Sequence, residues 1–360
     1  MDLAELERAE IEDAVAGLGL PRFHGRQIFR WIHHRAVTDF DRMTDLPRPA
    51  RATLARSFTI GTPAIESRHT SEDGTTKFLL ALADKRHIES VYIPDTPAQT
   101  FCVSTQVGCA MACAFCLTGR MGLIRHLSAG EIAGQARVLA HATGLAARAF
   151  NIVLMGMGEP LHNYDATMKA LRMLADSQGL AVHPTRITLS TVGLLPALAR
   201  LATEPIMPNI AISLHATTDD DRSRLVPLNR RYDLEALLDA CRAFPLKRRG
   251  RITFEYVLLA GVNDRPEDAR RLAGLLGDIR GKVNLLPLNE APGIPFNRPT
   301  DEQVHRFAGM LAERGVRVSV RRSRGRDIRA ACGQLIVEGT DTRSAGQDLA
   351  TRMGRTERHA

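Results

Sequence analysis

Aromatic residues are scarce in this sequence of 360 residues, and it has neither long apolar runs nor a strong excess of one charge. Phe, Trp and Tyr make up 5% of it, with Trp31 the single tryptophan, which argues against the many stacked rings that long single strands of nucleic acid need. The uncharged stretch 97–119 holds polar residues and four cysteines, so it fails as a membrane span. The acidic start of the chain does not resemble a leader peptide. We therefore expect a cytoplasmic protein without a membrane partner.

The charge that is present is mildly basic and unevenly placed. Lys and Arg number 48 against 40 Asp and Glu, which gives a net charge of +8 and hints at a polyanionic partner. Arginines gather in residues 21–56 and 314–329, with a shorter basic run at 247–251. For these arginines we favour contacts with RNA phosphates. For the interleaved Phe29 and Trp31 we favour a small helical core over stacking on bases.

Cysteine is concentrated in one place, because four of the six fall within 15 residues. The pattern Cys109-x-x-x-Cys113-x-x-Cys116 lets a short loop wrap three thiolates around one metal centre. A structural zinc site needs four ligands, whereas a 4Fe–4S cluster held by three thiolates leaves one iron open. Two alternatives stay open: a zinc site completed by Cys102 or His126, and buried cysteines that cluster by chance.

Strand-like runs alternate with amphipathic segments along most of the chain. Two of these segments begin with capping boxes, at 128–131 and 300–303, which mark helix starts. The alternation predicts an α/β fold with a parallel sheet, open or curled into a barrel. In such folds reactive groups lie on loops after the strands, and the cysteine loop follows the first strand of the series. The runs are Thr100–Ser104, Asn151–Met155, Arg186–Ser190, Asn209–Ser213, Arg251–Leu258, Lys282–Leu286 and Val316–Val320.

A set of motifs in a fixed order resembles one enzyme family. The cysteine loop is similar to that of radical S-adenosylmethionine (SAM) enzymes, and the whole set resembles the RlmN/Cfr family of RNA adenine methyltransferases. The motifs are Glu89–Pro94, Cys102–Cys116, Gly156–Pro160, Ser213–His215, Val283–Pro287 and Arg326–Gln334.

The resemblance implies an α/β fold, a partial (β/α)6 radical-SAM barrel over residues 95–325. A small helical N-terminal accessory domain, residues 1–88, would bind RNA, and we expect its first helix to begin at a capping Asp2. A C-terminal segment, residues 326–360, would carry Cys332 and end in a polar tail from Gly339.

The same resemblance implies two cofactors, a 4Fe–4S cluster and SAM, with two SAM molecules used per turnover. The cluster would be held by Cys109, Cys113 and Cys116. The residues expected to contact SAM are Gly158, Glu159, Ser190, Ser213, Leu214, His215 and Asn289.

Three further residues have catalytic roles in the resemblance. Cys332 would accept a methyl group from one SAM and pass it, as a radical, to the adenine ring. Cys102 would then release the RNA from Cys332, leaving a Cys102–Cys332 disulfide, and Glu89 would accept a proton. We expect neighbouring arginines to lower the pKa of Cys332; these are Arg324, Arg326 and Arg329.

The expected function is therefore methylation of carbon 2 of an adenosine in 23S rRNA, and by the same resemblance in tRNA. A reducing electron-transfer protein would be a further partner. Two alternatives stay open: methylation at adenine carbon 8, as in Cfr, and a non-enzymatic RNA-binding protein that contains a metal.

Overall fold

A single large sheet organises the computed structural model, which describes residues 1–94, 99–246 and 250–337. Its ten strands lie in the order β1-β2-β3-β4-β7-β8-β9-β10-β11-β12. From β4 onward neighbouring strands are parallel, and these seven coincide with the seven predicted runs. The parallel strands are β4 Thr100–Cys102, β7 Asn151–Leu154, β8 Ile187–Thr191, β9 Asn209–Ser213, β10 Ile252–Leu258, β11 Gly281–Pro287 and β12 Val318–Val320.

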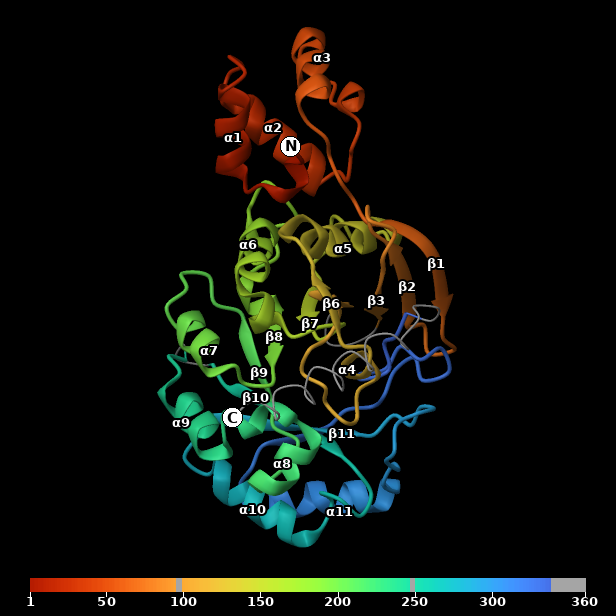
Figure 1. Cartoon of the computed structure of the whole chain (residues 1–360), viewed down its shortest axis with the longest axis vertical. Helices are drawn as coiled ribbons and strands as arrows, with labels where there is room; N and C mark the ends of the chain where they lie inside the picture. Colours follow the sequence, from red (N-terminus) through yellow and green to blue (C-terminus); the bar gives the residue numbers. More distant parts are fainter. Residues whose placement is uncertain (95–98, 247–249, 338–360) are drawn as a thin grey trace, which may run out of the picture.

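The helices between these strands cover the sheet as the sequence predicts (Figure 1). Six strands, β4 and β7 to β11, form the expected partial barrel, and the three-residue β12 extends it. Both predicted capping boxes are confirmed, on α5 and α11. The helices of this region are α4 Leu117–Arg120, α5 Ala129–Ala142, α6 Tyr164–Ala175, α7 Leu195–Leu201, α8 Asp219–Leu225, α9 Leu234–Ala243, α10 Pro266–Leu276 and α11 Asp301–Ala312, with 3-10 turns at Pro160–Asn163, Pro184–Arg186 and Pro227–Arg230.

Three antiparallel strands extend the sheet at its other edge. They are β1 Ala64–Thr70, β2 Thr76–Ala81 and β3 His87–Ile93, and β3 pairs with β4 so that Val91 lies opposite Cys102. The expected accessory domain of residues 1–88 therefore consists of two structurally different parts. Its last third is joined to the barrel by backbone hydrogen bonds, and only the part before β1 is a separate helical unit.

The N-terminal helical unit consists of α1 Arg8–Ala16, α2 Phe23–His33 and α3 Arg48–Ser57 around a small apolar core, with 3-10 turns at Leu3–Glu5 and Phe40–Arg42. It stands on α5 and α6 (Figure 1). Asp2 caps only the 3-10 turn, whereas α1 begins at Arg8 with its own capping box. The expected single helix from Asp2 is therefore wrong. Between the two elements, Glu5 docks on the start of α5 by accepting hydrogen bonds from Ser128 Oγ (2.5 Å) and the Gly130 N–H (2.7 Å).

The last described residues, 326–337, lie against the sheet beside β2 and β3. Ser71 donates to the Asp327 carboxylate, and the Gly325 N–H donates to Asp73 Oδ2 at 3.0 Å. The expected polar tail from Gly339 and part of the basic run 247–251 lie outside the described residues. Within the described part of the chain, no helix is both long enough and apolar enough to span a bilayer.

Candidate active site

The cysteine loop connects the two strands of a short hairpin, and contacts at three places hold it. The hairpin pairs β5 Gln106–Gly108 with β6 Leu123–His126. Gly108 has φ +76°, and a Cβ there would lie 1.9 Å from the Gly122 carbonyl oxygen, so this close approach requires glycine. Further along the loop, the Ala114 N–H donates to the Leu225 carbonyl at 3.0 Å, and the Leu117 N–H donates to the Gly333 carbonyl at 2.8 Å. The second bond fastens the loop to the segment that carries Cys332.

Cys109, Cys113 and Cys116 line one cavity of about 200 Å³. Burial raises the pKa of each thiol, that of Cys109 to about 12. In the described part of the chain, no three His, Cys, Asp or Glu side chains converge closely enough to hold a single metal ion. A 4Fe–4S cluster is larger and binds each thiolate at a different iron, so this donor set fits it.

The neighbouring strand ends bring most of the predicted SAM contacts into the same cavity. Its wall includes residues after β7, at the ends of β8 and β9, and after β11. The Leu214 side chain, in contrast, is fully buried in the main core and does not line the cavity. The predicted residues that do line it are Gly158, Glu159, Ser190, Ser213, His215 and Asn289.

Glu159 is a buried carboxylate held by the backbone of two loops. Its Oε1 accepts from the Leu161 N–H at 3.0 Å and its Oε2 from the Val192 N–H at 2.9 Å. Burial raises its pKa to about 7, and the hydrogen bonds oppose that rise. No cation pairs with it among the described side chains. A ligand ammonium in this cavity would therefore find a preorganised counter-charge.

Gln106 holds the turn that presents Glu159, and no motif predicts this role. Its Oε1 accepts from the Glu159 N–H at 2.9 Å, while its Nε2 contacts His126 Nδ1 at 3.0 Å and His162 Nδ1 at 3.2 Å. The two imidazoles fix which way the amide points. Gly158 packs directly on it, because a Cβ at Gly158 would lie 2.7 Å from Gln106 Cβ. The sequence signal that could identify Gln106 is its position three residues before Cys109, the first cysteine of the loop.

His215 is held in one tautomer. The Val257 N–H donates to its Nδ1 at 3.1 Å, so the ring proton is on Nε2. Burial, with Arg222 as a smaller cause, lowers the pKa of His215 to about 3. Phe115 of the cysteine loop packs edge-on against the ring, with centroids 4.7 Å apart. His215 is thus a neutral hydrogen-bond donor beside the cluster loop.

Asn289 carries the clearest sign that the cavity is built for a polar ligand. Its Oδ1 is buried and has no hydrogen-bond partner among the described residues. Leaving a buried acceptor unpaired costs about 1–3 kcal/mol. A ligand that donates to this oxygen would remove that cost. With Glu159 and His215, Asn289 offers an anion, a donor and an acceptor, which suits the amino, carboxylate and ribose groups of SAM.

Cys332 lies between two cavities: the one lined by the three loop cysteines, and a second one. It is exposed to both, and the second, of about 420 Å³, is also lined by Cys102. The Cys102 side chain is buried, and burial together with Cys332 raises its pKa. Both cysteines are free thiols, so the expected Cys102–Cys332 disulfide is not supported by this structure.

The expected lowering of the pKa of Cys332 is wrong. Although the side chain is exposed to the cavities, their walls desolvate the thiol and, with Glu255 as a second cause, raise its pKa to about 11. The one cation that opposes this is Arg321. Closeness in sequence does not predict this pKa, because its shift has no contribution from Arg324, Arg326 or Arg329. Arg321, Arg322 and Arg324 nevertheless line the second cavity.

Glu89 does not line either of these cavities. It is buried in an adjoining pocket, where its Oε1 lies 2.8 Å from Lys77 Nζ and its Oε2 accepts from the Ile336 N–H at 2.9 Å. The carboxylate therefore anchors the segment that follows Cys332. Its predicted role as a proton acceptor is not tested by this placement.

The arginines and aromatic rings of the N-terminal unit separate as the sequence predicts. Phe29 and Trp31 are buried in its core. Arg26 and Arg30 lie on the exposed side of α2 and make no ion pair within the described part of the chain. Arg22 is instead paired with Asp13 of α1.

Comparison with known families divides the chain as the fold does. Residues 103–273 match the radical SAM superfamily. Residues 1–60 match the ribosomal RNA large subunit methyltransferase N-terminal domain. The second match ends just before β1, at the boundary that the structure gives for the helical unit.

The chain is similar to characterised proteins over nearly its whole length. It is 48% identical to the dual-specificity RNA methyltransferase RlmN of Syntrophotalea carbinolica, over 93% of this chain and 89% of that protein. It is 44% identical to the same enzyme of Dinoroseobacter shibae, over 98% and 93%. Among solved structures, a radical SAM methyltransferase from Sphaerobacter thermophilus superposes with a TM-score of 0.89 at 47% identity, over 93% of this chain and 99% of that one.

Proposed function

Because the chain belongs to the RlmN family of radical SAM RNA methyltransferases, we propose that it methylates carbon 2 of an adenosine in 23S rRNA and in tRNA. The observation that supports this most is the position of Cys332. Its thiol reaches the cavity of the three loop cysteines on one side and the cavity of Cys102 on the other. A group that must first take up a methyl and then deliver it to a base needs access to both places.

The loop cysteines and the polar wall of their cavity fit the two cofactors. Cys109, Cys113 and Cys116 would hold a 4Fe–4S cluster, with Glu159, His215 and Asn289 around SAM. When bound, these cofactors supply a transferable methyl group and, after one-electron reduction, a 5′-deoxyadenosyl radical. An electron-transfer protein would provide that electron.

Cys332 is the proposed methyl carrier. Its thiol must lose a proton to become a nucleophile, and the raised pKa makes this loss less favourable than for a thiol in water. Once methylated, the sulfur carries no charge, which suits a desolvated wall. Loss of a hydrogen from that methyl group then leaves a carbon radical on Cys332 that can add to adenine.

Addition to the base would leave RNA joined to Cys332, and two groups would complete the reaction. The radical adduct would first give back the electron that the electron-transfer protein supplied. Cys102, on the wall of the same cavity, would then attack the Cys332 sulfur and break its bond to the added carbon, which takes up a proton as the methylated base leaves; the transient Cys102–Cys332 bond would be opened by a thiol reductant. Glu89 would take the ring proton. Because it now anchors the Ile336 N–H, its action requires residues 328–337 to move when RNA binds.

The second cavity is the proposed place for the target base. An adenine in folded RNA must be unstacked before its ring edge can meet Cys332. Arg321, Arg322 and Arg324 line this cavity and would contact the phosphates on either side. Arg26 and Arg30 would contact the RNA further along.

Mass spectrometry of modified RNA tests this proposal. After anaerobic reconstitution with iron, sulfide, SAM and a reductant, unmodified 23S rRNA and tRNA are incubated with the protein and digested to nucleosides. We expect 2-methyladenosine from both RNAs. Formation of 8-methyladenosine instead would show the Cfr-like reaction. Bound zinc with no 4Fe–4S absorption, and no methylation of either RNA, would favour the metal-containing RNA-binding protein.

A further inference from the structure

Arg222 is a fully buried cation whose hydrogen-bond partners are all neutral. It lies on α8, with 1% of its surface exposed. Its guanidinium donates to the carbonyls of Leu214 (3.1 Å), Val192 (2.8 Å) and Ser213 (3.2 Å), and to Asn229 Oδ1 (2.9 Å). A buried charge without a counter-ion is costly. Such a residue is a candidate for a functional role.

The surroundings of Arg222 are those of the cysteine loop. Val192 and Leu225 pack with Cys113 in one apolar cluster. The Leu225 carbonyl holds the Ala114 N–H of the loop, whereas the Val192 carbonyl is held by Arg222 itself. Arg222 therefore braces the ends of β8 and β9 from beneath the loop.

Arg222 and Cys113 interact electrostatically, and each shifts the pKa of the other. Burial lowers the pKa of Arg222 to about 10, and Cys113 is the largest of the opposing influences. At neutral pH the guanidinium is therefore still protonated. Asp219 also contributes to the pKa of Arg222, but its carboxylate oxygen accepts a hydrogen bond from Asn229 rather than from Arg222.

A fixed cation at this place has a simple consequence for iron–sulfur chemistry. A cluster with three thiolate ligands gains one negative charge when it is reduced. The potential of such clusters depends on the net charge around them and on solvent exposure. In a buried site of low dielectric constant, a neighbouring positive charge stabilises the reduced form more than the oxidised form.

We propose that Arg222 is the buried counter-charge of the cluster, a positioning residue that raises the reduction potential of the cluster while it fixes the ends of β8 and β9. This inference rests on the proposed function, since it requires that the three loop cysteines hold a 4Fe–4S cluster. It assigns to Arg222 an electrostatic task that its hydrogen bonds alone would not require.

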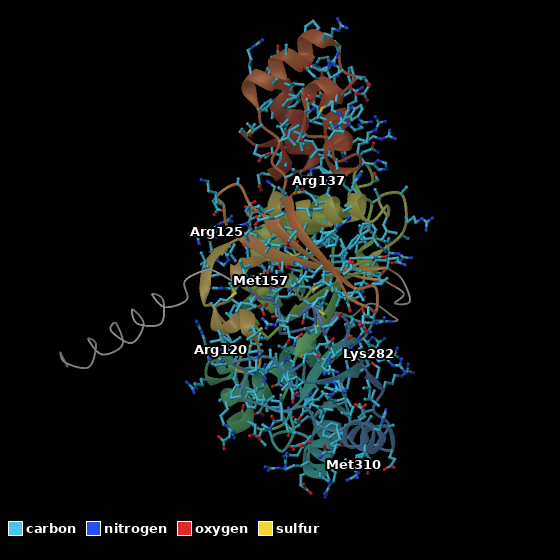
Figure 2. The ribbon with its side chains drawn as sticks, turned by 90° about the vertical axis from the view of Figure 1, so that its right-hand side faces the viewer. Arg120, Arg125, Arg137, Met157, Lys282 and Met310 are labelled. Atoms are coloured by element: carbon cyan, nitrogen blue, oxygen red, sulfur yellow. The ribbon has the colours of Figure 1, made fainter. Side chains whose placement is uncertain are left out.

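The chain offers a matched control in Arg137. This second arginine is equally buried, at 1% exposure, and also lacks an ion pair within the described part of the chain. It lies on α5 where the N-terminal unit meets the barrel (Figure 2). Its NH2 group donates to the Gly61 carbonyl at 2.9 Å. Arg137 is thus a buried arginine of the same kind, but the charges that act on it are those of Asp2 and Glu5 in the N-terminal unit and not that of a loop cysteine.

The test is a redox titration of the reconstituted cluster followed by electron paramagnetic resonance, with thermal unfolding measured in parallel. We expect Arg222→Gln to shift the reduction equilibrium about tenfold toward the oxidised form, which is about 59 mV for one electron. Arg222→Lys keeps the charge and should stay close to the wild type. Arg137→Gln should lower the unfolding temperature without moving the potential.

The outcomes separate the inference from its premise. An unchanged potential in Arg222→Gln with an intact cluster spectrum would overturn the inference, and so would equal shifts in the Gln and Lys variants. If the Gln variant does not fold, the Lys variant decides: a potential within error of the wild type supports the role of charge, and a drop as large as that expected for Gln contradicts it. A wild-type protein that takes up no cluster would refute the proposed function instead.

Discussion

The strand ends of the barrel and the N-terminal helical unit use charge in opposite ways. At the strand ends Glu159 and Arg222 are buried, and each is held by several hydrogen bonds to fixed backbone groups. In the helical unit Arg26 and Arg30 are exposed and unpaired within the described part of the chain. The difference suits a small cofactor in the first case and a large polyanion in the second. Substitutions should therefore act sharply at the strand ends and gradually in the helical unit.

The largest effect is expected from the cysteine loop. Cys113→Ala should abolish the 4Fe–4S absorption and all SAM cleavage, because two thiolates cannot hold the cluster. Cys241→Ala is the matched control, since Cys241 is an equally buried thiol in α9. Anaerobic reconstitution followed by absorption spectroscopy measures both. An intact cluster in the Cys113 variant would refute the ligand assignment.

The next effect concerns the glutamine beneath Glu159. Gln106→Leu removes the acceptor of the Glu159 N–H, and we expect KM for SAM to rise about tenfold. Gln135→Leu is the control. Gln135 is equally buried, and bonds Ser104 and Ser90 rather than Glu159.

Both glutamine variants should lose about 1–3 kcal/mol of unfolding free energy, but only the first should lose SAM affinity. Steady-state kinetics and urea unfolding of the two proteins give the comparison. A similar rise of KM in both would show that Gln106 acts through general stability, and the difference between the two regions would weaken.

A graded effect is expected from the exposed arginines. Arg26→Ala and Arg30→Ala should each weaken RNA binding and lower the slope of log affinity against log salt by about one, because each lost phosphate contact releases fewer counterions. SAM cleavage should be unchanged. Arg306→Ala, an exposed arginine of α11 paired with Glu302, is the control. Equal RNA affinity in all three variants at moderate salt would mean that α2 carries an ordinary solvated surface.

The smallest effect is expected where the two regions meet. The carboxylate of Glu7, the residue that caps α1, lies 2.8 Å from the guanidinium of Arg172 of α6, and both side chains are about one-third exposed. Such a pair contributes about 0.2–1 kcal/mol. A double-mutant cycle with Glu7→Gln and Arg172→Gln, measured by urea unfolding, should give a coupling energy in that range. A coupling of several kcal/mol would show that the helical unit depends on this contact.

The sequence predicts the parallel part of the fold well because its strands are buried on both faces and form short apolar runs. It misses β1 to β3 as strands. Most side chains of β1 are exposed, so no buried face marks it, and Glu89–Pro94 stands out in the sequence only as a motif. The first helix is misplaced because Asp2 and Glu5 look like a capping box, whereas Glu5 caps α5, more than a hundred residues away.

The motifs predict which residues line the candidate cavity, but not the residues that hold them in place. Motif positions bring Glu159, His215 and the cysteines into one cavity, as the resemblance implies. Gln106 and Arg222 could not be selected, because their roles come from contacts between distant segments. The pKa of Cys332 is wrongly predicted for the same reason: desolvation by the cavity walls outweighs the arginines that are near it in sequence.

The two thiols of the second cavity allow the most direct test of the account. With Cys332→Ala there is no methyl acceptor, so no bond to RNA can form. With Cys102→Ala the methyl group can still be taken up and joined to the base, but nothing releases it. Purification under denaturing conditions, nuclease digestion and mass spectrometry measure the product. The account predicts RNA bound covalently to Cys332 in the Cys102 variant and none in the Cys332 variant; normal turnover of the Cys102 variant without bound RNA would contradict it.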